Sequence, residues 1–301
     1  LNAAVARKHL HGDLLGALTV EENALEALSK TLPDNHLALQ QVRQNLAITK
    51  YGVGDLNGSL ALAEKVLAVY SSTMPDGHCV VSLARMNLGI IKRSLGDLRG
   101  SIMLQDSALS LLSARLSEDH PYVQSARQNL GNTKRSLGDL NSSLALHEKV
   151  LAARSATLPD DHPDLQSARL ACATSKRMLG DVEGAQELGQ KALTALSSSL
   201  PTDHPGLVSA RANLGATKVA IGDHPAAAEL CLANLVASTH LLARSQMSAR
   251  EAGQVALAAS SPRRLGPSAS CTVCRPASRS TRARRTSMIR IGPPTGRAQS
   301  F

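Results

Sequence analysis

The sequence predicts an all-α solenoid of stacked helix pairs, and three observations carry that prediction. A Gly-Asp pair recurs every 42 residues without insertion or deletion. Single His, Arg and Lys positions keep the same period, which chance would not align. Each period holds two stretches with apolar residues at helical spacing. Units of this length stack because one unit cannot bury its apolar face alone, and the stack offers partners an extended surface.

Two of the periodic series mark the expected boundaries of the helices. Glycine accepts the left-handed backbone that commonly ends a helix, and His followed by Pro fits the start of one. We assign the histidines to packing and capping. The glycine series runs through Gly12, Gly54, Gly96, Gly138, Gly180 and Gly222. The histidine series runs through His36, His78, His120, His162 and His204.

The first helix of a unit is clearest after His162. Pro163 suits the first turn, where a missing amide hydrogen costs least, and Asp161 is a plausible N-cap. The helix is expected to end at Gly180. Its apolar stripe comprises Leu165, Ala168, Cys172 and Leu179.

The second helix should begin at Asp181, whose carboxylate can accept from free amides of the first turn, and end near Ser199. A short connection then reverses the chain before His204. Small residues twelve apart indicate where the two helices cross closely. The pairs are Ala47 with Ser59, Gly89 with Ser101, Gly131 with Ser143, Ala173 with Ala185, and Gly215 with Ala227.

Charge is distributed unevenly along the chain. The formal net charge is +9, but nine of the 33 basic residues are arginines between Ser261 and Phe301, where no acid occurs. Residues 1–260 therefore carry 24 basic and 24 acidic side chains. The repeat array is charge-balanced, so the overall charge says nothing about its partner. No segment has the 18 apolar residues of a membrane span, and we expect a cytoplasmic protein.

Cysteine usage gives no disulfide framework. Cys79, Cys172 and Cys231 stand at places where a small buried apolar residue would serve equally well. Cys271 and Cys274 form a single Cys-x-x-Cys with no second pair, which is too few ligands for zinc. The histidines stand one per repeat instead of converging, so we expect no metal and no cofactor.

The small-residue pairs, the Gly turns and the Asp-His-Pro junctions resemble the long tetratricopeptide repeats of the kinesin light chain type. The resemblance covers residues 1–240, with a truncated first unit and a degenerate last one. It implies a right-handed superhelix whose first helices line a concave groove that binds extended peptides. Similar bacterial arrays are joined to signalling ATPase modules or to CHAT-type protease domains, and this chain could be the recruiting region cut from such a protein.

The resemblance places two further series on the groove side of the first helices. Asn can both donate to and accept from a peptide backbone, and Arg can grip a carboxylate bidentately. The sequence thus suggests a groove that prefers an acidic peptide, although the same residues could be polar filling of an exposed face. The asparagines are Asn45, Asn87, Asn129 and Asn213, and the arginines are Arg93, Arg135 and Arg177.

Another pair of basic series departs from the family pattern, at Arg169 and Lys176 and their equivalents in other units. We interpret them as structural charges that cover the helix junction and pair with acids; a ligand-binding ladder is the alternative. No catalytic residue is expected. Cys172 fills the slot that holds Leu46, Leu88, Leu130 or Leu214 in other units, which marks it as core.

The remaining segments are expected to differ from the array. Residues 241–260 are Ala- and Leu-rich and suggest a helical cap. Residues 261–301 have the composition of a disordered tail, which either binds nucleic acid through its arginines or results from a shifted reading frame. The main reading is a non-catalytic scaffold for a protein or peptide, with nucleic-acid binding through the tail as the rival.

Overall fold

The computed structural model describes residues 14–239 of the chain. Each 42-residue unit contributes an A helix, which follows the periodic histidine, and a B helix, which follows the Gly-Asp pair. The A helices are α3 (Leu37–Gly52), α5 (Cys79–Ser94), α7 (Pro121–Leu137), α9 (Pro163–Met178) and α11 (Pro205–Ile221). The B helices are α2 (Leu14–Thr31), α4 (Leu56–Thr73), α6 (Leu98–Ser113), α8 (Leu140–Thr157), α10 (Val182–Ser199) and a last helix covering 224–239.

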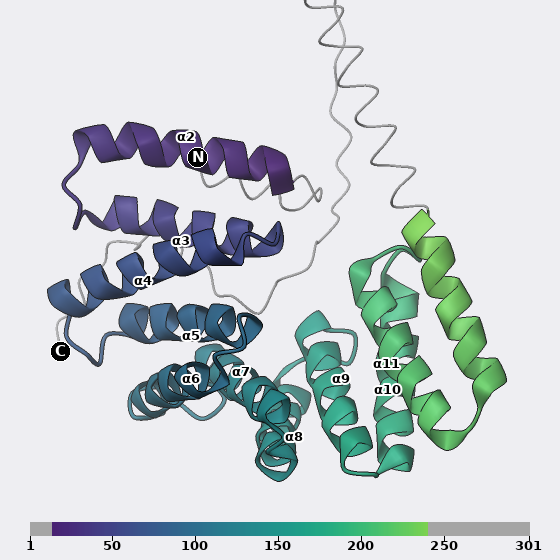
Figure 1. Ribbon diagram of the computed structural model, residues 1–301. Helices are drawn as coiled ribbons and strands as arrows, with labels where there is room; N and C mark the ends of the chain where they lie inside the picture. The colour runs from purple at the N-terminus through teal and green to yellow at the C-terminus, as the bar shows by residue number, and fades with distance from the viewer. Residues whose placement is uncertain (1–13, 240–301) are drawn as a thin grey trace, which may run out of the picture.

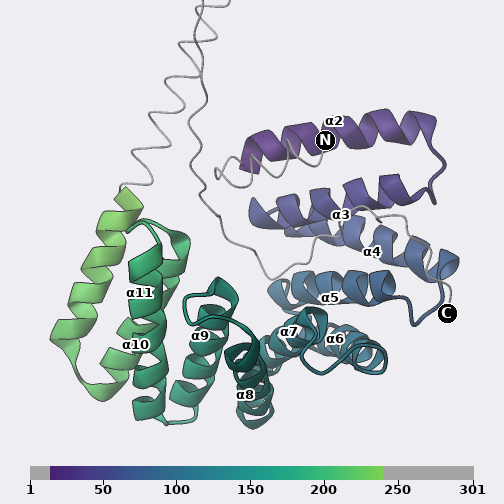
Figure 2. The ribbon, with the colours of Figure 1, turned by 180° about the vertical axis from the view of Figure 1, so that it is seen from behind.

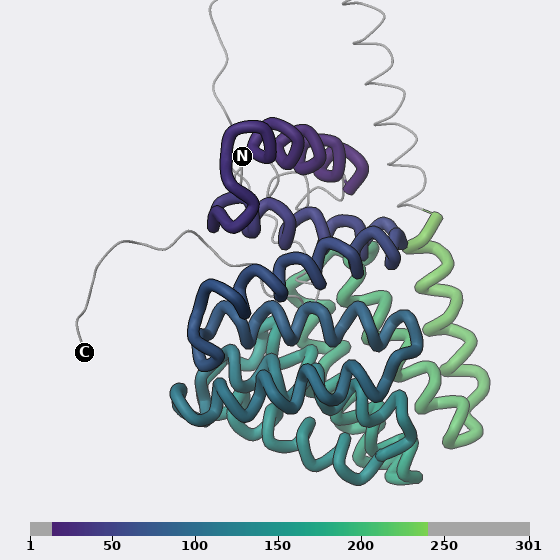
Figure 3. Tube along the Cα trace, turned by 60° about the vertical axis from the view of Figure 1, so that its left-hand side comes forward, coloured from purple at the N-terminus to yellow at the C-terminus, as the bar shows by residue number. Residues whose placement is uncertain are grey.

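The helices form the superhelical solenoid that the sequence predicts. Each helix packs against its neighbours in sequence, and the chain runs back and forth along the stack (Figure 3). In Figure 1 the helices of the first units lie across the view, whereas α9, α10 and α11 stand nearly upright. Successive units are therefore rotated along the array. Seen from behind, α2 and the helix at 224–239 lie at its opposite ends (Figure 2).

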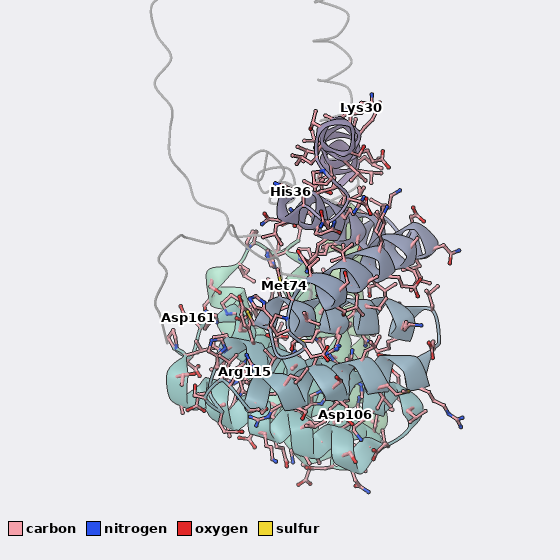
Figure 4. All side chains as sticks on the ribbon, turned by 90° about the vertical axis from the view of Figure 1, so that its left-hand side faces the viewer. Lys30, His36, Met74, Asp106, Arg115 and Asp161 are labelled. Atoms are coloured by element: carbon pink, nitrogen blue, oxygen red, sulfur yellow. The ribbon has the colours of Figure 1, made fainter. Side chains whose placement is uncertain are left out.

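Each A helix begins at its histidine. The imidazole Nδ1 accepts a hydrogen bond from the backbone amide two residues later, at 3.2 Å for His36 and 3.0 Å for His204. His78, His120 and His162 make the same bond. The N-cap of α9 is therefore His162, and our choice of Asp161 was wrong by one residue. These junctions follow one side of the array, where Figure 4 labels His36, Met74, Arg115 and Asp161.

The turn from A helix to B helix depends on the Gly-Asp pair. Gly54, Gly96, Gly138, Gly180 and Gly222 all have φ between 87° and 93°, the left-handed region that glycine tolerates best. The aspartate that follows is the N-cap of the B helix. In α6, Asp97 accepts from the amide of Gly100 at 2.8 Å, and a cap of this kind stabilises a helix by about 1 kcal/mol.

Close helix crossing relies on the small-residue pairs. The hydroxyl of Ser59 donates to the carbonyl of Ala47, and that of Ser101 donates to the carbonyl of Gly89, both at 2.7 Å. The core continues from unit to unit. One buried cluster joins α5, α6 and α7 through Leu83, Met86, Ala108, Leu112, Val123 and Ala126.

Candidate functional site

The inner side of the solenoid is formed by the A helices. Helix α7 contacts both α5 and α9, and α9 also contacts α11. Within residues 14–239, no two B helices pack against each other to a comparable extent. Elements come closest on the concave side of a curved stack, so the A helices line the inner face and the B helices the outer one. Arg93, Arg135 and Arg177 belong to α5, α7 and α9.

These three residues occupy the same position in the last turn of consecutive A helices, and we call them the arginine ladder. All three are half-buried. The burial of Arg135, followed by the repulsion of Arg93 and Arg177, lowers the pKa of its guanidinium. Arg135 therefore lies close enough to Arg93 and to Arg177 for its charge to be repelled by both.

The ladder has no counter-charge within the described part of the chain. None of the ion pairs between residues 14 and 239 involves Arg93, Arg135 or Arg177. The Nε atoms of Arg93 and Arg177 and the Nη1 atom of Arg135 are buried without a hydrogen-bond partner. Each guanidinium has five N–H donors and is only half-buried, so its other donors can meet acceptors from outside.

The arginines of a second series form ion pairs or hydrogen bonds with other residues of the array. Arg85 pairs with Asp76 of the preceding junction at 3.0 Å. The same arrangement recurs in three other units, as Arg43 with Asp34, Arg127 with Glu118, and Arg169 with Asp160. In the last unit Arg211 donates to the carbonyl of Thr202 at 2.9 Å. These arginines fasten the junctions, which supports the structural interpretation of the Arg169 series.

The lysine series is also paired. Lys92 lies 3.0 Å from the carboxylate of Asp97, the N-cap of the next helix. Hydrogen bonds from the Gly100 amide and then from Lys92 hold the pKa of Asp97 below its usual range. The equivalent pairs are Lys50 with Asp55, Lys134 with Asp139, Lys176 with Asp181, and Lys218 with Asp223. The ladder differs from both other basic series because its charges have no acidic partner.

Different residues occupy the ladder position in the units on either side. In α3 the position holds Tyr51, whose hydroxyl lies 2.9 Å from Ser94 Oγ in the next A helix. In α11 it holds Val219, which is 55% exposed. The charged part of the inner face is therefore restricted to three consecutive units.

The asparagine series lies between neighbouring A helices. Asn45, Asn87 and Asn129 are buried. Asn213 is half-buried, and its amide donates to the carbonyl of Leu170 at 3.2 Å and to Thr174 Oγ1, both on α9. At least in this unit, the asparagine joins two successive A helices.

A buried polar layer between A and B helices had not been recognised in the sequence. His147 of α8 is 1% exposed, and its Nδ1 lies 2.8 Å from Ser175 Oγ of α9. In the preceding unit Gln105 takes the equivalent place and accepts from Thr133 at 2.7 Å. The available signal was Gly89 and Gly131 at the same place on the A helices, where a Cβ would collide with Gln105 and His147 respectively.

The described cysteines differ in exposure. Cys172 is buried, and burial raises the pKa of its thiol to about 11. Cys79 and Cys231 are exposed, so our expectation that all three replace buried apolar residues was wrong for these two. No group of three or more His, Cys, Asp or Glu residues in the described range could hold a metal ion. No helix in that range is long and apolar enough to cross a membrane.

Comparison with known sequences identifies the repeat. Two tetratricopeptide-repeat profiles match consecutive stretches, one at residues 40–78 and the other at 80–156. A search of curated proteins found no match to this sequence. The first three of the complete units therefore carry the family signal.

Solved structures share the architecture at low sequence identity. A kinesin light chain-type protein of Podosopora anserina with nearly identical TPR-like repeats has a TM-score of 0.56 and 20% identity, covering 69% of this chain and 98% of that one. BtubC from P. vanneervenii has a TM-score of 0.58 and 16% identity, covering 88% and 98%. A Rap protein complexed with competence and sporulation factor has a TM-score of 0.60 and 12% identity, covering 79% and 74%.

Proposed function

Because this chain is a tetratricopeptide-repeat array with the fold of kinesin light chain-type proteins, we propose that it is a non-catalytic scaffold that binds an extended, acidic segment of a partner protein. The binding surface is the inner face of α5, α7 and α9. Tetratricopeptide repeats generally serve protein–protein interaction, and a Rap protein of similar fold was solved in complex with a partner.

The observation that carries the proposal is the unpaired charge of the arginine ladder. The C-terminal end of each A helix offers Arg93, Arg135 and Arg177 only a partial negative charge, about half an elementary charge. A carboxylate from a partner supplies a full charge and accepts two parallel hydrogen bonds from one guanidinium. It also relieves the repulsion within the ladder, which opposes burial of the three arginines.

The asparagines extend this proposal along the same helices. Asn87 and Asn129 precede Arg93 and Arg135 by six residues on α5 and α7. Both side chains are buried between A helices, at 4% and 2% exposure, and Asn213 of the same series bonds across such a contact to α9. In this proposal the arginines select acidic side chains, and the buried asparagines position the A helices that carry the arginines instead of contacting the ligand.

Peptide-array binding to the full chain tests the proposal. We expect acidic peptides to bind better than neutral or basic ones, and the combined change Arg93→Gln, Arg135→Gln and Arg177→Gln to abolish that preference. The matched control changes Arg282, Arg284 and Arg285 to Gln, which removes equal charge from the tail. Loss of binding in the tail variant alone would instead support the rival, in which residues 261–301 bind polyanions such as nucleic acid.

The role of the asparagines has a separate test. Replacing Asn87 and Asn129 with Ala should weaken the binding of acidic and neutral peptides alike, because the change loosens the packing between the A helices that form the binding surface. Unchanged affinity for both peptide classes would show that the asparagines do not position the binding surface.

A further inference from the structure

The spacing of the arginine ladder defines a length that a ligand must match. Helix α7 contacts both α5 and α9. The axes of packed helices are about 8–10 Å apart, so the three helices that carry Arg93, Arg135 and Arg177 follow one another at roughly that interval. A ligand that neutralises all three must therefore present one acid about every 8–10 Å on a single side.

Extended conformations differ in how they meet this requirement. A β-strand rises about 3.3 Å per residue and alternates its faces, so side chains on one face recur at about 7 Å or 13 Å. A polyproline II helix has three residues per turn and rises about 3.1 Å per residue. Every third side chain then lies on the same side, about 9 Å from the last. This repeat falls within the interval of about 8–10 Å, whereas the repeats of a strand fall on either side of it.

The ladder also limits how many acids can be bound. Its position holds Tyr51 in the preceding unit and Val219 in the following one. Neither side chain carries a positive charge, and the hydroxyl of Tyr51 already contacts Ser94. A fourth acid at the same interval therefore meets no arginine.

We infer that the partner segment binds in a polyproline II conformation with an acidic residue at every third position, three in all, each facing one of Arg93, Arg135 and Arg177. The inference rests on the proposed function, because it specifies the pattern of the acidic segment. A proline between the acids favours the bound conformation before binding and so strengthens the interaction.

Isomeric peptides test the spacing with the full chain of residues 1–301. Each peptide carries three glutamates among Pro, Ala and Gln residues of one composition, and fluorescence anisotropy measures its affinity. Glutamates at every third position should bind about tenfold more tightly than the same glutamates at every second position, at every fourth position or in one run. A fourth glutamate at the three-residue interval should change the affinity less than about twofold.

Variants then connect the spacing to the ladder. Arg135→Gln should remove the preference for the three-residue interval, because it leaves two arginines twice as far apart. Arg135→Lys keeps the charge and should retain part of the preference. Arg99 is exposed on helix α6, and Arg99→Gln removes the same amount of charge. This variant should leave the preference for the three-residue interval unchanged. Circular dichroism checks that each variant keeps its helices.

The outcomes separate this inference from the proposed function. Equal affinity for all spacings, or tightest binding at an interval of two, four or seven residues, overturns the polyproline II register but leaves an acidic ligand in place. If acidic peptides bind no better than neutral ones, the result contradicts both the polyproline II register and the proposed function.

Discussion

His147 shows how a single residue can make the stability of this array depend on pH. Burial, followed by the charge of Arg135, lowers the pKa of the imidazole from 6.5 to about 4. Because the pKa in the folded state lies below that of the unfolded chain, the unfolded chain takes up the proton first as the pH falls. Folded stability contributed by neutral His147 is therefore complete above pH 6.5 and is lost between pH 6.5 and 4.

The variant His147→Gln tests this dependence, because Gln105 fills the equivalent place in the preceding unit beside Gly89. Between pH 7 and pH 4 the free energy of unfolding should fall more in the native protein than in the variant, by up to about 3 kcal/mol. Urea unfolding at a series of pH values measures the free energy of unfolding of the native protein and of the variant. Parallel curves would show that His147 is protonated equally in the folded and unfolded states.

Cys172 offers a second test at the scale of a residue. Its slot holds leucine in four other units, and a hollow of about 340 Å³ lies beside it, lined by Glu148, Leu151 and Lys176 among others. Cys172→Leu should raise the free energy of unfolding by about 1 kcal/mol, because added apolar atoms fill part of this space. Thermal unfolding measures the change. A lower midpoint would mean that the neighbouring helices have already closed around the smaller side chain.

At the scale of the element, the side chains of the A and B helices complement each other in volume where the helices cross. Where the B helix carries a large polar residue, Gln105 or His147, the A helix has glycine. Where the B helix has Ala63 or Gly189, the A helix has Ala47 or Ala173 instead. The space between the helices thus stays filled whichever partner provides the volume.

A double-mutant cycle tests this complementarity. A Cβ at Gly131 would lie 2.6 Å from His147 Nε2, so Gly131→Ala should destabilise the protein by about 1–3 kcal/mol. In a His147→Ala background the same change should be neutral or stabilising, since alanine is the better helix former. Equal effects in both backgrounds would mean that the two residues do not share this space.

The element boundaries followed closely from the sequence, because glycine, aspartate and histidine each have one physical role at a turn. The N-cap of α9 was misplaced by one residue because both Asp161 and His162 can accept from a backbone amide, and the choice depends on how the junction folds. The exposure of Cys79 and Cys231 could not be predicted from the apolar character of cysteine. Cys79 is the first residue of α5, and the buried residues of that helix begin only at Val81.

At the scale of the whole molecule, the inner face depends on which charges the fold leaves unpaired. The sequence shows three basic series with the same period, and nothing in their spacing separates them. Only the structure shows that Arg85 and Lys92 meet acids of the junction and the cap, whereas Arg93 faces another arginine, Arg135. The ladder was among the predicted site residues, but its lack of counter-charges was beyond the reach of sequence.

The residues outside 14–239 hold the remaining expectations. The truncated start of the first unit, the proposed cap at 241–260 and the Arg-rich tail at 261–301 all lie outside the described residues. The structures expected for these three segments stay predictions. The idea that the chain is the recruiting part of a larger signalling protein also stays a prediction.

Arginine footprinting tests the central claim most directly, because it reads each guanidinium separately. Phenylglyoxal is reacted with the full chain with and without the peptide that carries glutamate at every third position, and modified arginines are quantified by mass spectrometry. We predict that the peptide protects Arg93, Arg135 and Arg177, while Arg99 and the tail arginines react as before. Unchanged labelling of the ladder under saturating peptide would contradict the claim that these arginines form the binding surface.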